Sequence, residues 1–285
     1  MVYTVIAYSL LDIAGRGIAK NIIELSVCHP ASAGEIADLE GVVESYICKD
    51  GGLAVLGFSM DTVELDVLGK LGEAVKEVIV VSRHSAKSGR PSLTTHTPGN
   101  PWGRNDAGGK PWEIPPSNPV LMWHILRELY KKREEQGLQN YEACYEVTHH
   151  GPTSVTRPIT FVELGSSEKE WIDVKAQRAV AHATLSALYK AERSEANCIV
   201  TVGFGGTHYA PLFTRRALEE HECYGHMVPG YVIKELTLDE LRSVAKKVIE
   251  MTPGCQRVVI EKMRRDVRNV IEEVASSSGL EVVRY

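Results

Sequence analysis

An apolar run of strand length, Glu77-Val78-Ile79-Val80-Val81, lies in the first third of the chain. Its β-branched residues favour an extended backbone. Because apolar residues do not alternate with polar ones, both faces of the predicted strand should be buried, as in a sheet covered on both sides. The run therefore indicates a strand at the centre of a layered α/β structure.

Strand and helix patterns precede and follow this run. Val2 to Tyr8 is a predicted strand, and a helical stretch with apolar residues from Ile18 to Leu25 follows it. Val42 to Ile47 and Leu53 to Phe58 are predicted to form a hairpin, because Lys49-Asp50-Gly51-Gly52 between them carries turn residues. The chain thus begins with a βα unit and a hairpin.

The second half of the chain continues the alternation. The predicted elements are a helix opened by Asn118-Pro119 and running to Lys132, a strand from Ala143 to Thr148, a helix behind the capping box Ser167-x-x-Glu170, a strand from Cys198 to Val202, helices near Leu238 to Glu250 and Arg264 to Ala275, and strands at Arg257 to Ile260 and Glu281 to Val283. We expect an α/β three-layer sandwich with a mixed, largely parallel sheet. The pattern shows no repeat or linker, so residues 1–285 are predicted to form a single domain.

The segment 82–116 has a different composition. It is dense in Gly, Pro, Ser, Thr and Asn, and it contains Trp102 and Trp112. Long loops in compact domains are usually functional or disordered, and two tryptophans favour packing over disorder. We expect a long, ordered active-site loop here.

Composition excludes several classes of protein. No apolar run approaches the roughly 20 residues of a membrane span, and the first residues lack the features of a signal peptide. The six cysteines are scattered without a C-x-x-C pair, which fits a reducing cytoplasm best. The net charge of −5 gives no global basic field, so a nucleic acid partner would need a local basic patch. We expect a cytoplasmic protein that needs no membrane and no obligate protein partner, and a monomer by default.

Four histidines follow predicted strands closely: His84, His149 and His150 within one to three residues, and His208 six residues after Val202. Ligands of open α/β sheets bind beyond the carboxyl ends of strands, so these side chains are candidates for one shared site. Neutral imidazole is a good zinc ligand, and catalytic zinc takes about three protein ligands. The four histidines are therefore candidate metal ligands and catalytic residues, although each could instead be a loop or core residue bonded to backbone.

Three further residues are candidates from their positions. His96 lies in the long loop and is either a weaker ligand candidate or a turn residue, and His226 is a weaker candidate in a short tract that also contains Glu222 and Cys223. Glu163 follows an apolar run and precedes a predicted helix. Its carboxylate could bind metal or act as a general base, or simply favour the helix N-terminus.

Two loops are candidates for substrate binding. Gly205 and Gly206 follow a predicted strand and could offer backbone N–H groups to a phosphate or an oxyanion. The surrounding sequence matches neither the Walker A motif nor the dinucleotide fingerprint. Lys87 and Arg90 lie near His84 in a basic loop that could contact RNA phosphates, although such charges are more often solvated.

Five motifs of this sequence resemble those of the D-aminoacyl-tRNA deacylase family of archaea and plants. They are Ser82-Arg83-His84-Ser85-Ala86-Lys87, His96-Thr97-Pro98-Gly99-Asn100, Thr148-His149-His150-Gly151-Pro152-Thr153, Glu163-Leu164-Gly165-Ser166-Ser167-Glu168-Lys169-Glu170-Trp171, and Gly203-Phe204-Gly205-Gly206-Thr207-His208-Tyr209-Ala210-Pro211. Their order and spacing extend across most of the chain, which is more specific than any single motif.

The resemblance implies an enzyme that hydrolyses the ester bond of D-aminoacyl-tRNA and uses about two zinc ions per chain. It also implies a core similar to those of peptidyl-tRNA hydrolases and nucleoside phosphorylases. The alternatives are another hydrolase or phosphorylase of the same fold that acts on nucleosides or peptides, or a non-catalytic RNA-binding protein. A mechanism without metal, in which a histidine or the 2′-hydroxyl of the substrate assists, also stays open.

Overall fold

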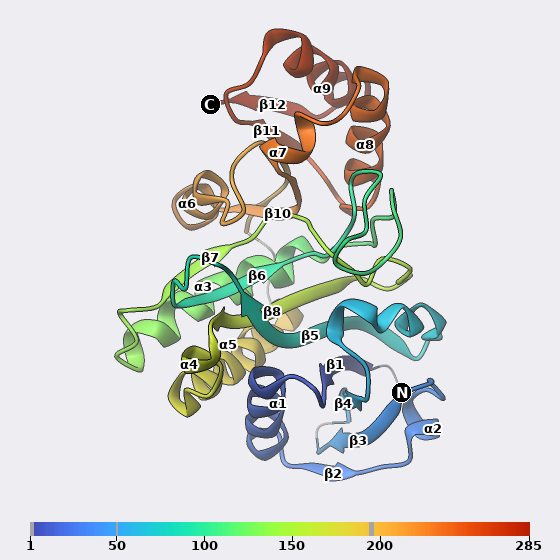
Figure 1. Ribbon diagram of the computed structural model, residues 1–285, viewed down its shortest axis with the longest axis vertical. Coiled ribbons are helices and arrows are strands. Elements are labelled where there is room, and N and C mark those ends of the chain that lie inside the picture. Colours follow the sequence, from blue (N-terminus) through green and yellow to red (C-terminus); the bar gives the residue numbers. More distant parts are fainter. Residues whose placement is uncertain (1–2, 50, 194–196) are drawn as a thin grey trace.

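The computed structural model describes residues 3–49, 51–193 and 197–285, which form a mixed α/β structure with two sheets (Figure 1). The larger sheet has eight strands in the order β2-β3-β4-β1-β5-β8-β6-β7. Their bounds are β1 (Tyr3–Ser9), β2 (Cys28–Pro30), β3 (Val42–Cys48), β4 (Leu53–Phe58), β5 (Val75–Ser85), β6 (Ser92–His96), β7 (Glu142–Tyr145) and β8 (Ile159–Ser166). Strands β4, β1, β5 and β8 are parallel, whereas β6 pairs antiparallel with β8.

Alternate residues of the central strands pack on opposite faces of this sheet. In β5, Ile79 and Val81 pack with one hydrophobic cluster, whereas Val78 and Val80 pack with another. Helices α1 (Ile13–Leu25), α3 (Pro119–Glu135) and α5 (Val174–Arg193) contribute to the first cluster, and α2 (Ala33–Ile36) and the 3₁₀ segment η1 (Thr62–Lys70) contribute to the second. Both faces of the sheet are therefore covered, as the apolar run predicted.

The smaller sheet is entirely parallel and has the order β10-β9-β11-β12. Its strands are β9 (Ile199–Phe204), β10 (Glu222–Val228), β11 (Arg257–Ile260) and β12 (Glu281–Arg284). Helices α8 (Leu238–Glu250) and α9 (Arg265–Ser277) cover one face, and α6 (Pro211–Glu219) packs on the other. The short helices α4 (Glu168–Trp171) and α7 (Gly230–Ile233) complete the helices of the described residues. The sequence predicted one sheet, and the C-terminal strands form this second one.

Helix α3 lies between the two sheets. Its side chains Leu121, Ile125 and Leu129 pack with the larger sheet, whereas Met122 and Leu126 pack with the smaller one. Asn118 caps the helix by accepting a hydrogen bond from the Leu121 N–H, as its position before proline predicted. The apolar contacts of this one helix thus join the two parts of the chain.

Several predicted boundaries are wrong. The segment 82–116 is not one loop, because the end of β5 and all of β6 lie within it; the loop runs from Thr97 to Asn118. Strand β7 ends at Tyr145 rather than Thr148, and the helix predicted after Ser167 is divided into α4 and α5. The hairpin prediction is confirmed, since β3 and β4 pair antiparallel, although Asp50 of its turn lies outside the described residues.

Four cysteines form disulfides, which their scatter along the sequence did not indicate. Cys28 pairs with Cys48 across β2 and β3, and Cys198 pairs with Cys223 beside β9 and β10. Each bridge joins neighbouring strands of one sheet. Within the described ranges, no helix combines the length and apolarity required to cross a membrane.

Candidate metal and catalytic site

Segments far apart in the sequence bring histidines and glutamates together where the two sheets meet. Strands β5, β6 and β8, the segment after β7 and the segment after β9 all contribute. The residues, here called the histidine–glutamate cluster, are His84, His96, Glu146, His149, His150, Glu163 and His208. The cluster contains all four histidines that the strand-end argument selected, together with Glu163 and His96.

Glu146 is the hub of one half of the cluster. Its carboxylate is fully buried, with Oε2 3.0 Å from Nε2 of His208 and Oε1 3.0 Å from Nδ1 of His84. Nε2 of His149 lies 3.4 Å from the same carboxylate. Burial alone would raise the pKa of Glu146, but the bond from His208 and the charge of His84 hold this pKa below its usual value. The carboxylate is therefore ionised and orients several imidazoles.

Glu163 is the carboxylate of the other half of the histidine–glutamate cluster. It accepts a hydrogen bond from Ser82 Oγ at 2.8 Å, and one of its oxygens lies 3.3 Å from Nδ1 of His84. Burial opposes ionisation, but the neighbouring imidazoles of His150 and His84 keep the pKa of Glu163 well below its usual range. Although burial also disfavours a charged imidazole, the two carboxylates raise the pKa of His84 to about 10. His84 is thus a cation held between two anions.

Burial lowers the pKa of His149 well below its usual value, so its imidazole is neutral. Nδ1 of His149 lies 2.8 Å from the Val147 carbonyl, and Nδ1 of His150 lies 2.6 Å from the Gly151 carbonyl. A carbonyl only accepts, so each Nδ1 carries a proton and each Nε2 is the nitrogen left to face a metal. Nε2 of His150 lies 3.2 Å from Nε2 of His96, whose burial lowers its pKa to about 4.

This arrangement could hold a metal ion. Metal-binding imidazoles commonly donate their second N–H to a carbonyl, which is what His149 and His150 do. Three sets of ligand atoms lie within 4.8 Å of one another: His96 with His149 and His150, His84 with Glu146 and His208, and His96 with Glu146 and Glu163. Each set offers the nitrogen and oxygen donors that zinc prefers. The first two sets have no residue in common.

A cavity of about 150 Å³ opens beside this cluster. His149 and His150 form one wall, and Trp102 and Tyr231 form an aromatic wall with ring centroids 5.9 Å apart. The loop between β6 and α3 supplies Trp102, together with other lining residues from Asn100 to Ala107. The first half of this loop therefore lies beside the candidate site, and its role in activity stays a prediction.

Comparison with known proteins places the chain in a family. A sequence model of the D-aminoacyl-tRNA deacylase family matches residues 71–283. D-aminoacyl-tRNA deacylases of Aeropyrum pernix and Hyperthermus butylicus are 37% and 35% identical to the chain, over 97% and 96% of its length and 98% and 97% of theirs. The chain belongs to the D-aminoacyl-tRNA deacylase family. The resemblance seen in its motifs is thereby confirmed.

A solved structure supports the fold. The crystal structure of a conserved protein of unknown function is 28% identical to this chain and superposes with a TM-score of 0.86, covering 99% of this chain and 95% of the other. The deacylase of Archaeoglobus fulgidus is 32% identical over 96% of this chain and 93% of its own length. The two-sheet architecture therefore has a counterpart in an experimental structure.

Some predicted site residues lie outside the cluster of this family member. His226 is buried, with its ring nitrogens 3.1 Å from Thr148 Oγ1 and from the Pro115 carbonyl, so it supports the backbone rather than a metal. The N–H of Gly205 donates to the Val228 carbonyl, so its predicted role as an oxyanion donor is wrong. Gly205 and Gly206 instead line a separate cavity.

The predicted basic residues lie on the surface beyond β5. Lys87 is exposed in the turn that leads to Ser88, whose hydroxyl is 3.4 Å from that of Tyr209. Arg90 pairs with Glu142 through a 2.7 Å contact and is 58% exposed. Lys87 is closer than Arg90 to His84 in the sequence, and neither residue makes an ion pair with the histidine–glutamate cluster among the described residues.

Two site residues were missed from the sequence. Glu146 lies within the apolar run 143–148, and a charged residue at such a position is a usable signal for a functional role. Tyr209 follows His208, and its hydroxyl is 3.1 Å from Nε2 of His84. It was missed because a tyrosine next to a stronger candidate has no pattern of its own.

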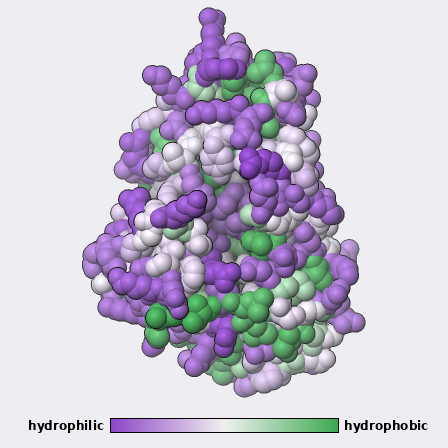
Figure 2. Space-filling view, viewed as in Figure 1, coloured by the Kyte–Doolittle hydropathy of each residue, from purple (hydrophilic) through white to green (hydrophobic). Residues whose placement is uncertain are grey.

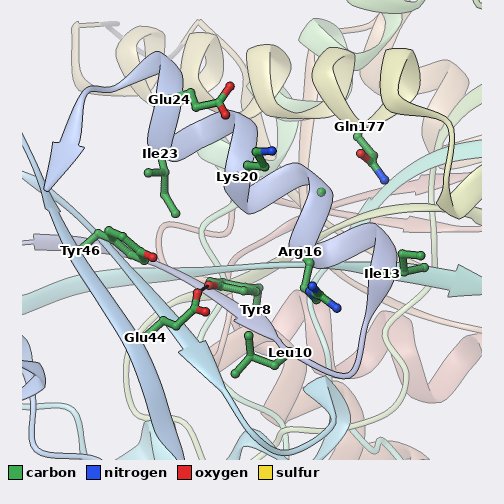
Figure 3. A pocket seen from close by; sticks show the side chains of 11 residues that line it. Tyr8, Leu10, Ile13, Arg16, Lys20, Ile23, Glu24, Glu44, Tyr46 and Gln177 are labelled. Carbon is green, nitrogen blue, oxygen red and sulfur yellow. Dashed lines mark hydrogen bonds between the residues drawn. The ribbon is translucent and has the colours of Figure 1, made fainter. Parts of the chain in front are cut away.

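Another cavity lies away from this cluster. It has a volume of about 510 Å³ and lies between α1 and the sheet, with Tyr8, Tyr46, Arg16 and Lys20 among its lining residues (Figure 3). The hydroxyl of Tyr8 donates to Glu44 there. Figure 2 shows green, apolar patches among hydrophilic side chains in the lower part of the view, where α1 and α4 lie in Figure 1. None of the seven residues of the histidine–glutamate cluster lines this cavity.

Proposed function

We propose that the protein hydrolyses the ester bond of D-aminoacyl-tRNA and releases the D-amino acid and free tRNA. The observation that carries the proposal is the cluster of buried histidines and ionised carboxylates at the junction of the two sheets, in a chain of the deacylase family. Ester hydrolysis needs an activated water and stabilisation of a developing oxyanion. We place the reaction in the cytoplasm, with aminoacyl-tRNA as substrate and the protein acting as a monomer.

His96, His149 and His150 are the proposed zinc ligands, because His149 and His150 each have Nε2 free and Nδ1 bonded to a carbonyl. Bound zinc supplies a Lewis acid and lowers the pKa of water to about 7. The set of His84, Glu146 and His208 is the other candidate, for the second of about two zinc ions per chain, but it would bind an ion only if His84 lost its proton and His208 gave up its role in proton transfer. The zinc content of the purified protein tests this assignment.

His208 is the proposed residue that moves a proton during hydrolysis. Its side chain is 34% exposed, against 4% for His84 and 0% for Glu146, so it is the cluster member most open to a substrate. Glu146 orients its ring through the 3.0 Å contact to Nε2, as a carboxylate does in catalytic acid–histidine pairs. Glu163 is a weaker candidate for the base, because Ser82 and His84 already contact its oxygens.

The aminoacyl group is proposed to occupy the cavity beside His149 and His150. Its volume of about 150 Å³ suits one side chain, and Trp102 and Tyr231 offer aromatic surface. Discrimination against L-aminoacyl esters would come from walls that exclude the L side chain rather than from tighter binding of the D form.

The test is release of D-tyrosine from D-tyrosyl-tRNA, measured beside the L-ester. The protein is assayed as purified, after treatment with a chelator, and after zinc is restored. We expect cleavage of the D-ester alone, its loss with chelator and its recovery with zinc. Cleavage that persists in chelator would overturn the zinc assignment, and failure to cleave either ester would overturn the deacylase proposal.

A further inference from the structure

A second cavity opens at the carboxyl ends of the smaller sheet, outside the histidine–glutamate cluster. It has a volume of about 410 Å³. The segment after β9 lines it with Gly205, Gly206 and Thr207, and the segment after β11 lines it with Glu261, Lys262 and Arg264. A cavity of this size is within the usual range for small-molecule sites.

The topology of the sheet creates this cavity. Strands β9 and β11 are parallel neighbours, but the chain segments that follow them run over opposite faces of the smaller sheet. Helix α6, which follows β9, packs on the face that contains Tyr224 and Val259. Helix α9, which follows β11, packs on the face that contains Val202 and Phe204. In open α/β sheets, the crevice where adjacent connections diverge in this way is the usual place for a ligand.

A carboxylate oxygen in the cavity lacks a partner. Oε2 of Glu261 is buried and makes no hydrogen bond to the described residues. The glycines allow this close approach, since a Cβ at Gly205 would lie 2.6 Å from Cβ of Glu261 and one at Gly206 would lie 3.3 Å from its Oε2. A buried acceptor without a partner is costly, so a ligand that donates a hydrogen bond is expected there. Ribose hydroxyls are such donors and are commonly bound by an acidic residue in crevices of this kind.

The rest of the lining fits the other parts of a nucleotide. Lys234 and Lys262 are exposed at the rim and offer cations to phosphate oxygens. Ile233, Met263 and Val267 offer apolar surface to a base. The cavity thus combines a cationic rim, an unpaired carboxylate and an apolar wall, which match phosphate, ribose and base.

The cavity also adjoins the proposed reaction centre. Thr207 lines the cavity, and the next residue, His208, contacts Glu146 of the cluster. Helix α7 separates this cavity from the one beside His149: Gly230 and Ile233 line the first, whereas Tyr231 and Val232 line the second. A group bound at Thr207 is therefore next to His208 of the histidine–glutamate cluster.

We propose that this cavity binds the 3′-terminal nucleotide of aminoacyl-tRNA, an inference that rests on the proposed deacylase function. The terminal ribose carries the ester on one of two adjacent hydroxyls. The free hydroxyl donates to Glu261, and the esterified one faces the cluster. Lys262 and Lys234 contact phosphate on the 5′ side of the same nucleotide.

Binding of adenosine 5′-monophosphate, measured by isothermal titration calorimetry, tests the cavity without turnover. The unmodified protein is expected to bind this probe, and Glu261→Gln to weaken binding about tenfold through loss of a charge-assisted hydrogen bond. The exposed Lys262→Glu change is a second variant that leaves the core intact and should weaken binding by repelling phosphate. Glu273→Gln, on the exposed surface of α9, is the matched control and should bind normally.

Competition against D-tyrosyl-tRNA hydrolysis links the cavity to the substrate. An RNA hairpin ending in CCA should inhibit hydrolysis more strongly than one ending in CC. The Glu261→Gln variant should be inhibited equally by both hairpins, and its KM for D-tyrosyl-tRNA should rise more than its kcat falls. The cavity assignment would be overturned if both hairpins inhibited hydrolysis equally, or if both cavity variants bound AMP as well as the unmodified protein does. Either result would leave the proposed function standing. If neither ester is cleaved although both variants weaken AMP binding, the assignment to a tRNA terminus fails together with the deacylase function.

Discussion

Nε2 of His208 lies 3.0 Å from Oε2 of Glu146, although the two residues belong to different sheets. Glu146 follows β7 of the larger sheet, and His208 follows β9 of the smaller one. Backbone bonds reinforce the contact, since the Val147 N–H donates to the His208 carbonyl and the Thr148 N–H donates to the Met227 carbonyl. The candidate site is therefore assembled by the junction of the sheets, and neither sheet alone contains it.

Replacing Glu146 by glutamine tests the hub of this junction. The variant keeps the size of the side chain but removes the charge that orients His84 and His208, so deacylation should fall about 10- to 100-fold, with a parallel loss of bound zinc. Activity and metal content, measured on the same preparation, check this. Glu142→Gln in β7 is the control. If Glu146→Gln keeps full activity and zinc, Glu146 has no role beyond packing.

Tyr209→Phe tests whether the missed tyrosine positions His84. The ring is retained, and only the hydroxyl that bonds to Nε2 of His84 at 3.1 Å and to Ser88 Oγ at 3.4 Å is lost. We expect kcat to fall about 10- to 150-fold with little change in KM, because a hydrogen bond to a charged group contributes about 1.5–3 kcal/mol and each 1.4 kcal/mol is about a factor of ten in rate. An unchanged kcat and pH profile would show that the hydroxyl does not act through His84.

The order of strands and helices was predictable because it depends on local patterns. The apolar run Glu77 to Val81 predicted a strand buried on both faces, and Asn118-Pro119 predicted the start of α3. The second sheet was not predictable, because strand pairing over long separations leaves no mark in the periodicity of either strand. The disulfide between Cys28 and Cys48 was missed for the same reason, since only pairing of β2 with β3 brings the two cysteines together.

The histidines of the site were found because they share one position relative to predicted strands. That rule could not separate His226 from the others, because its role depends on Thr148 and on the Pro115 carbonyl, which only the fold brings to it. The same rule correctly selected Gly205 as a strand-end residue. It could not reveal that the Gly205 N–H already donates a hydrogen bond to the Val228 carbonyl of β10. Sequence position thus predicts the rim of a sheet, whereas hydrogen-bond partners decide which groups remain free.

His226 should make stability depend on pH. Burial lowers its pKa to about 4 from the usual value near 6.5, so the native state holds it neutral. Above pH 6.5 this contribution to stability is fully present. As the pH falls from 6.5 to 4, His226 is protonated in the unfolded state but not in the native state, so the free energy of unfolding falls by about 3 kcal/mol. Urea unfolding of the protein and of His226→Gln over this range measures the difference.

The expected result is a shallower loss of unfolding free energy toward pH 4 in the His226→Gln variant. His29→Gln, at an exposed position in β2, is the control and should keep the slope of the unmodified protein. Equal slopes for the protein and both variants would mean that His226 takes up a proton as readily in the native as in the unfolded state.

The two sheets are predicted to unfold together as one domain, and Leu126 tests this. Its side chain is fully buried among residues of the smaller sheet, while Leu121 and Ile125 of the same helix pack with the larger one. Leu126→Ala should lower the free energy of unfolding by about 2–5 kcal/mol through loss of apolar burial and the remaining cavity. Because α3 serves both sheets, calorimetry should show one transition that shifts as a whole, and Lys131→Ala, at an exposed position of α3, should leave it unchanged. Two separate transitions, only one of which moves in Leu126→Ala, would show that the sheets are independent domains and that the site between them assembles by docking.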